Sequence, residues 1–540
     1  RLRRQWAACP MLVAGLVLGT RGTAQALSAS PTGVSGTKLT VPGGSSEATP
    51  QQKRPTRAKT PVRRSSGSRR ASAAPLRHTS PRGEGSLASD LSGFLGARVR
   101  SGTWGVLVVS LSRGDTLYSY NADTRLLPAS TMKLFTTALA FDRLGPAHQF
   151  TTDVLRDGSV AADGTLIGNL VLRGGGDPGL SNRFIPGGQN SPMRALALQV
   201  ASTGIRKVRG DIVGDASAFE AQRVPDGWRT RYLDASYAQR VSALSLNENL
   251  LHVVIAPGQG KGAGKITLEP GSLDFKVVNE THTVPASGGA KLTVGRRPDG
   301  SIVARGWIGS RSQVRVYVVV VDDPALFATG AFRQALRDEG IEVTGEIKIG
   351  ASPATATRVA SLSSPPLSQL ASVMNRESVN HFAELIFRDA SRTADPMSVG
   401  SANAGNTLLQ QLMINRAGSS HDAFFTADGS GLSTLDRVTP RALVQLLSFA
   451  DRAPWSREFH ASLPVAGTSE LLRHRMIATP AQGNLHAKTG TTDEVIALGG
   501  YVHAQNGELL AFSFLYNGRE RWPARETIDA MGGTLAAFVR

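Results

Sequence analysis

The feature that most constrains this fold is a change in the spacing of apolar residues in the middle of the chain. Between about 150 and 350, short runs of alternating apolar and polar residues are separated by Gly and Pro, which is typical of β-strands. On both sides of this stretch, helix-like and strand-like apolar spacings are mixed. Two mixed segments around a strand-rich stretch indicate one discontinuous α+β domain with a large β-rich insert.

The segments outside the insert are expected to supply an antiparallel sheet and its helices. We predict one helix that starts at Ser130 and three that follow the insert, at 366–390, 440–452 and 522–539. Predicted strands of this domain cover 104–111, 115–121, 485–490, 496–504 and 508–517, and those of the insert include 166–173, 208–213, 251–256 and 314–321.

These patterns divide the 540 residues into four parts. Residues 1–26 are predicted to be a signal peptide, and 27–86 a disordered basic linker rich in Ser, Pro and Arg. Residues 87–150 and 360–540 form the predicted discontinuous domain, and 151–359 form the insert. This division agrees with the two or three domains expected for the length.

The first segment has the form of a secretory signal. Arg residues precede an apolar stretch over 6–18, and Ala24 and Ala26 form a small-x-small cleavage pattern. The only cysteine, Cys9, lies within it, so the mature chain is expected to have no disulfide. No later stretch approaches 18 apolar residues. We therefore expect a protein exported to the periplasm or cell-wall space, with no integral membrane span after signal cleavage.

The net charge of +18 suggests nucleic acid at first sight. However, residues 27–84 hold eleven Lys or Arg against only two acidic residues. This basic linker has no interleaved aromatic residues on which bases could stack. We therefore expect no nucleic-acid partner. The linker is interpreted as a solvated tether in preference to a segment that binds anionic cell-surface polymers.

Ser130 and Lys133 form a Ser-x-x-Lys pattern at a predicted helix start. Residues three apart share a helix face, so the hydroxyl and the amine would be neighbours. A serine needs a base to become nucleophilic, and a lysine with a lowered pKa can serve as one. The pattern alone is weak, because Ser35 and Lys38 match it too. A helix-capping serine beside a surface lysine is the more common reason for such a pair.

Lys488, Thr489 and Gly490 form the only Lys-Thr-Gly triplet, on a predicted strand followed by Thr491. A strand edge can pair with an extended substrate, and the lysine and hydroxyls can hold a carboxylate. The glycine allows close approach to the backbone. An exposed edge strand protected by a lysine is the alternative explanation.

The third pattern, Ser-x-Asn, occurs several times, and Ser378 with Asn380 is distinguished by its helical setting. Ser245 with Asn247, in the strand-rich middle, is an alternative. The ordered set of Ser-x-x-Lys, Ser-x-Asn and Lys-Thr-Gly is associated with penicillin-binding proteins and class A β-lactamases. Further similarity lies in 168–178, 210–215 and 428–433. From about Leu87 to Arg540, the chain resembles D-alanyl-D-alanine carboxypeptidases/endopeptidases of the penicillin-binding protein 4 type, the class C low-molecular-mass penicillin-binding proteins.

This resemblance implies a β-lactamase/transpeptidase-like domain with an insert of two nested subdomains. By motif, Ser130 would be the acylated nucleophile and Lys133 its general base. Ser378 would relay protons to the leaving amine, Lys488 would support it, and Asn380 would orient the substrate amide and Lys133. We also expect Lys488 to depress the pKa of Lys133 by like-charge repulsion.

The resemblance also assigns the substrate contacts. Thr489 and Thr491 would hold the terminal carboxylate beside Gly490, and the backbone N–H groups of Ser130 and Thr491 would form the oxyanion hole. The implied partners are peptidoglycan stem peptides, with β-lactam antibiotics as covalent inhibitors. No cofactor and no metal are implied.

Three positions depart from the family pattern. Val379 stands where relatives often carry a polar residue, and Thr434 where they often carry Arg. After Trp228, the nearest aspartate is Asp234, out of register with one that helps some relatives bind the cross-linking residue. The preference for the stem-peptide side chain therefore stays open.

Two other functions compete with this prediction. A serine β-lactamase of class A needs a glutamate that activates water, within Glu-x-x-x-Asn. None of Glu384, Glu458 and Glu470 has Asn four residues on, which disfavours this function. A non-catalytic peptidoglycan-binding protein is disfavoured by the intact motifs. His381, beside Asn380, is expected to be a packing residue.

Overall fold

The computed structural model describes residues 76–271, 275–392 and 398–540. They belong to one compact unit that spans 73–540. The predicted signal peptide and nearly all of the predicted linker lie outside the described residues. Within them, no helix is long and apolar enough to span a membrane.

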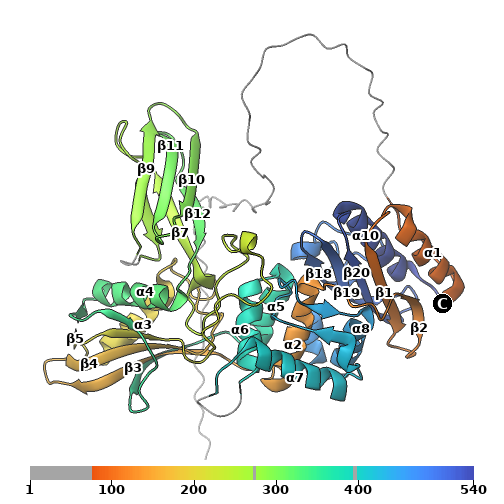
Figure 1. Ribbon diagram of the computed structural model, residues 1–540, viewed down its shortest axis with the longest axis horizontal. Helices are drawn as coiled ribbons and strands as arrows, with labels where there is room; N and C mark the ends of the chain where they lie inside the picture. The colour runs from red at the N-terminus through yellow and green to blue at the C-terminus, as the bar shows by residue number, and fades with distance from the viewer. Residues whose placement is uncertain (1–75, 272–274, 393–397) are drawn as a thin grey trace, which may run out of the picture. The chain divides into compact units, whose positions relative to one another are not determined.

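An antiparallel five-stranded sheet joins the two ends of the described chain (Figure 1). Its order is β18 (His486–Thr491), β19 (Val495–His503), β20 (Leu509–Asn517), β1 (Thr103–Ser110) and β2 (Thr116–Tyr120). β1 pairs along its length with β20, so segments some 400 residues apart in sequence complete one sheet. The predicted α+β fold and its discontinuous domain are confirmed.

Helices cover both faces of this sheet. On one face lie α1 (Glu84–Ala97) and α10 (Arg521–Ala537). On the other lies a helical layer built around α2 (Met132–Arg143), which is buried from Met132 to Phe141. Its remaining members are α5 (Leu367–Glu377), α6 (Asn380–Ala390), α7 (Ala402–Asn415), α8 (Pro440–Arg452) and α9 (Ser456–Ala461), with the two-residue strands β16 (Phe424–Phe425) and β17 (Arg437–Val438) nearby.

Several predicted boundaries differ from the structure. The predicted strand 208–213 is two short strands, Lys207–Arg209 and Ile212–Asp215, and the predicted end of the insert at 359 falls within the strand Thr357–Ser363.

Two further differences concern helices. α1 begins at Glu84, and Gly83 N–H donates to the Val539 carbonyl at 2.8 Å, so regular structure starts before the predicted boundary at Leu87. The predicted helix over 366–390 is two helices. Ser378 separates α5 from α6 in a left-handed conformation, with φ 60°. A non-glycine residue in this conformation carries no local sequence signal.

The insert has two parts. The first is a seven-stranded sheet of β3 (Thr151–Val160), β4 (Thr165–Gly174), β5 (Lys207–Arg209), β6 (Ile212–Asp215), β13 (Glu342–Val343), β14 (Ile347–Ile349) and β15 (Thr357–Ser363). α3 (Ser191–Ser202) and α4 (Pro324–Asp338) pack together over it. These two helices were not predicted, although Asp323 caps α4 and Pro324 begins it, which is a helix-start signal.

The second part consists of two three-stranded sheets. One contains β7 (Leu250–Ala256), β8 (Lys265–Glu269) and β12 (Arg315–Val320), and the other β9 (Val277–Val284), β10 (Ala290–Arg296) and β11 (Ile302–Gly309). All six strands lie in sequence between β6 and α4, so this part is nested within the first (Figure 1).

Candidate active site

Ser130 lies in a short 3-10 turn, Ala129–Thr131, that leads directly into α2. Two glycines lie close to the backbone of this turn. A Cβ on Gly490 would lie 2.7 Å from the Pro128 carbonyl oxygen, and one on Gly431 only 1.9 Å from that of Ala129. Glycine at these positions therefore lets β18 and the 428–433 loop pack against the backbone that carries Ser130.

Lys133 lies one helical turn beyond Ser130 and is fully buried. Its Nζ is 3.0 Å from Ser130 Oγ, 2.6 Å from Asn380 Oδ1 and 2.8 Å from the Ser430 carbonyl oxygen. Burial lowers the pKa of Lys133 to about 7, against the opposing effect of neighbouring carboxylates. A neutral amine here would donate its two N–H groups to the two acceptors, which leaves its lone pair for the proton of Ser130.

The insert fixes the orientation of Asn380. The Asn380 Nδ2 donates to the backbone carbonyl of Tyr237 at 2.8 Å, so Oδ1 faces Lys133. Asn380 begins α6, two residues after the left-handed residue Ser378. The sharp turn between α5 and α6 thus presents both residues of the Ser-x-Asn pattern to the same site.

Lys488 is the second buried lysine of the site. Its Nζ lies 2.9 Å from Ser378 Oγ and donates to the Thr489 carbonyl at 2.9 Å. Burial, and then the charge of Lys133, lower the pKa of Lys488 well below its ordinary value. We expected Lys488 to depress the pKa of Lys133, but burial is the only cause of that lowering. The repulsion between the two lysines lowers the pKa of Lys488 instead.

The remaining predicted residues lie along β18, which is an edge strand of the sheet. Thr489 is nearly buried and Thr491 is exposed at the strand end. Together, Ser130, Lys133, Ser378, Asn380 and the Lys-Thr-Gly strand form one connected cluster, as the motifs predict. The alternative serine, Ser245, is buried in the insert, where it contacts Ser242 and His381.

His381 is a packing residue. Burial lowers its pKa to about 3, so the ring is neutral. Its Nε2 lies 3.1 Å from Asn249 Nδ2, in the insert. Glu384 is equally buried and pairs with Arg388 at 2.8 Å. This ion pair, between residues four apart on α6, gives Glu384 a structural contact within the helix.

Sequence reasoning missed two groups that contact the site residues, the carbonyls of Ser430 and Tyr237. Backbone groups carry no residue identity, so no motif could assign them. The 428–433 stretch contributed to the family resemblance, but its contact with Lys133 was not predicted. Of the departures, Thr434 Oγ1 donates to the Gly227 carbonyl at 2.9 Å, whereas Asp234 is almost fully exposed.

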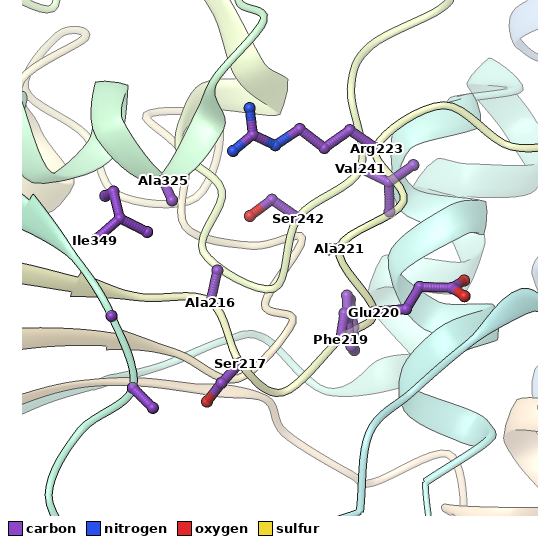
Figure 2. Close-up of a pocket in the computed structure, with 12 residues that line it drawn as sticks. Ala216, Ser217, Phe219, Glu220, Ala221, Arg223, Val241, Ser242, Ala325 and Ile349 are labelled. Carbon is purple, nitrogen blue, oxygen red and sulfur yellow. The ribbon is translucent and has the colours of Figure 1, made fainter.

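A separate cavity of about 250 Å³ contains none of these residues. Its lining includes Phe219, Glu220 and Arg223, together with Ala325 and Ile349 of the insert (Figure 2). The Glu220 carboxylate accepts the N–H of Ala402 at 2.9 Å and lies 3.3 Å from Arg388 Nε, so it serves a structural contact. The candidate site is therefore the cluster around Ser130.

Comparisons with known proteins find related carboxypeptidases. The family described as the D-Ala-D-Ala carboxypeptidase 3 (S13) family matches residues 94–538. A D-alanyl-D-alanine carboxypeptidase of Actinomadura sp. is 33% identical over 454 residues, which cover 80% of this chain and 81% of the relative. The carboxypeptidase DacB of Haemophilus influenzae is 25% identical over 418 residues, 77% of this chain and 85% of the relative.

Among solved structures, penicillin-binding protein 4 of Haemophilus influenzae has a similar fold. The TM-score is 0.69 at 24% sequence identity, over 82% of this chain and 98% of that structure. The same protein is also known in complex with a β-lactam, at a TM-score of 0.65 and 22% identity, over 82% of this chain and 97% of that structure.

Proposed function

Because this chain belongs to the D-Ala-D-Ala carboxypeptidase 3 (S13) family and is an enzyme of that class, we propose that it hydrolyses D-Ala-D-Ala peptides through an acyl-enzyme on Ser130. The observation that carries this proposal is the set of three contacts of Lys133. With both N–H groups of the neutral amine donated to Asn380 and Ser430, only the lone pair remains to face Ser130 Oγ.

In the proposed acylation step, Lys133 accepts the hydroxyl proton as Ser130 Oγ attacks the carbonyl carbon between the two D-alanines. The backbone N–H groups of Ser130 and Thr491 stabilise the oxyanion. When the tetrahedral intermediate collapses, the C–N bond breaks, and Ser378 relays the proton held by Lys133 to the leaving amine, with support from Lys488. Water then hydrolyses the ester and regenerates Ser130.

The substrate's terminal carboxylate is proposed to lie against Lys488, Thr489 and Thr491. Lys488 already contacts Ser378 at 2.9 Å, so a carboxylate bound there would place the leaving group beside the proposed proton relay. A β-lactam presents a similar amide and carboxylate and would acylate the same serine. Peptidoglycan stem peptides and their cross-links are the proposed substrates, in the periplasm or cell-wall space after removal of residues 1–26.

Two measurements test this function. Fluorescent penicillin should label wild-type protein at Ser130, as located by peptide mapping, and should not label folded Ser130→Ala. Purified muropeptides should lose their terminal D-Ala, and cross-linked dimers should yield monomers, both detected by mass. An adduct on another serine would refute the assignment of the nucleophile, and rapid turnover of nitrocefin would favour a β-lactamase.

A further inference from the structure

The loop over 428–433 lies beside Lys133 and is organised by one fully buried carboxylate, Asp428. Asp428 Oδ1 accepts the backbone N–H groups of Ser430 at 3.0 Å and Gly431 at 2.6 Å. Oδ2 accepts the N–H of Ser433 at 2.8 Å and the hydroxyl of Ser430 at 3.2 Å. A fifth donor, the indole Nε1 of Trp228, completes the set at 2.7 Å.

These contacts fix the direction of a single carbonyl group. With its N–H and its hydroxyl both bonded to Asp428, Ser430 directs its carbonyl oxygen to Lys133 Nζ at 2.8 Å. We propose that Asp428 is a positioning residue for the general base, and that the hydrogen bond from Trp228 of the insert keeps Asp428 in place. The proposal rests on the proposed function, because it assigns Lys133 as that base.

The insert reaches the same loop at two further points. Ser433 Oγ donates to the Asp226 carbonyl at 2.6 Å, and the Thr434 N–H and hydroxyl both bond to the Gly227 carbonyl. Asn380, the other acceptor of Lys133, is also oriented by an insert carbonyl, as described above. Both acceptors that direct the lone pair of Lys133 are therefore held from the insert, although the lysine belongs to α2.

Asp428 also sets the local charge. The ionisable groups that face Lys133 are Asp428, Glu384, Asp436 and Lys488. Burial and the charge of Asp428 raise the pKa of Asp436 well above its ordinary value and that of Glu384 to about 7, despite its partner Arg388. Among the carboxyl groups beside Lys133, Asp428 contributes most to holding the pKa of the lysine up. It opposes burial and keeps the pKa of Lys133 from falling further.

The test is the pH dependence of the acylation rate with benzylpenicillin. In wild type, the rate should fall on the acid side as Lys133 becomes protonated. Asp428→Asn removes the charge and turns an amide toward N–H donors. It should lower the plateau rate about tenfold or more, and move the acid limb to lower pH by about one unit. Asp428→Glu keeps the charge but not the geometry, so it should lower the plateau and leave the limb in place.

A matched control is Asp215→Asn in the insert, where the carboxylate also accepts two backbone N–H groups, from Ser217 and Ser352, away from Lys133. It should change neither plateau nor limb. Trp228→Phe removes only the indole donor, and it remains informative if Asp428→Asn does not fold. It should slow acylation several-fold in protein with a near-normal melting temperature.

The outcomes separate the positioning role of Asp428 from the proposed function. If Trp228→Phe acylates at the wild-type rate, or if folded Asp428→Asn keeps the wild-type plateau and limb, the positioning role is wrong while the proposed function stands. If wild type has no acid limb, or if Lys133→Ala acylates normally, the proposed function itself is wrong.

Discussion

Two buried lysines, Lys133 and Lys488, occupy the same site and differ in what surrounds them. Each is fully buried and lies within 3.0 Å of a serine hydroxyl. Carboxylates on the 428–433 loop, on α6 and at Asp436 oppose the effect of burial at Lys133. At Lys488, burial and the neighbouring Lys133 act in the same direction. The comparison shows that burial alone does not decide which amine keeps its proton.

The difference suggests how the two lysines divide their tasks in the proposed mechanism. Lys488 lacks the compensation that carboxylates give Lys133, and the substrate would bring one. A bound carboxylate stabilises a charged Lys488, and the charge of Lys488 then repels a proton from Lys133. The substrate would thus help to keep Lys133 neutral, so that it can accept the proton of Ser130.

The largest expected effect comes from removal of the proposed base. Lys133→Ala should slow acylation by penicillin by about 10²–10⁴, because loss of a general base typically costs this much. Stopped-flow labelling measures the rate, and Lys207→Ala, at a surface lysine that pairs with Glu342, is the control. Near-normal acylation would show that the two lysines have been assigned to the wrong tasks.

Lys488→Ala should have a smaller effect, and one that depends on the substrate. A hydrogen bond to a charged group contributes about 1.5–3 kcal/mol, so kcat/KM for a free-acid depsipeptide should fall about 10- to 100-fold. The methyl ester of the same depsipeptide should lose much less, because it brings no carboxylate. An equal loss on both substrates would break the proposed distinction between the lysines.

The dependence of kcat/KM on pH tests the assignment of Lys133, and not Lys488, as the base. Lys133 must lose its proton to act as a base, and its pKa is about 7 in the free enzyme. Below that pH, kcat/KM should fall toward about tenfold per unit, since each unit leaves a tenth of the neutral amine. The pH profile with a free-acid substrate measures this. A flat profile from pH 5 to 8, with an intact fold by circular dichroism, would contradict it.

Much of the catalytic domain was predictable because its strands alternate strongly and its motifs are short and local. The predicted helix 440–452 coincides with α8, and the predicted strands at the end of the chain match β18, β19 and β20 to within one residue at each end. The break at Ser378 was not predictable, because tertiary contacts and not a glycine impose the left-handed conformation.

The candidate site also has a part that the sequence predicts and a part that it does not. The motifs identified the Ser, Lys and Asn side chains that lie around Ser130, since they record residue types at fixed spacing. They could not identify the carbonyls of Ser430 and Tyr237, which any residue could supply. The surroundings of Lys133 therefore depend on long-range packing between the insert and the catalytic domain, at residue pairs such as Trp228 and Asp428.

The smallest effect on activity is expected from removal of the basic linker, which carries positive charge outside the site. If its charges reached the site, they would lower the pKa of both lysines, and removing them would move the acid limb. At physiological salt, exposed charges are screened beyond about 8 Å, so we expect no shift. A chain that begins at residue 76 should keep the wild-type acid limb, and kcat/KM within about twofold, on free-acid and esterified depsipeptides.

The position of this truncation matters, because the structure starts earlier than the predicted boundary. A chain that begins at Leu87 would lose the first turn of α1 and the bond from Gly83 N–H to the Val539 carbonyl. It should melt at a lower temperature than the chain from residue 76, with the ratio between free-acid and ester substrates unchanged. A change in that ratio on removal of 1–75 would mean that the linker acts on the lysines directly, and that their difference is not set by the folded surroundings alone.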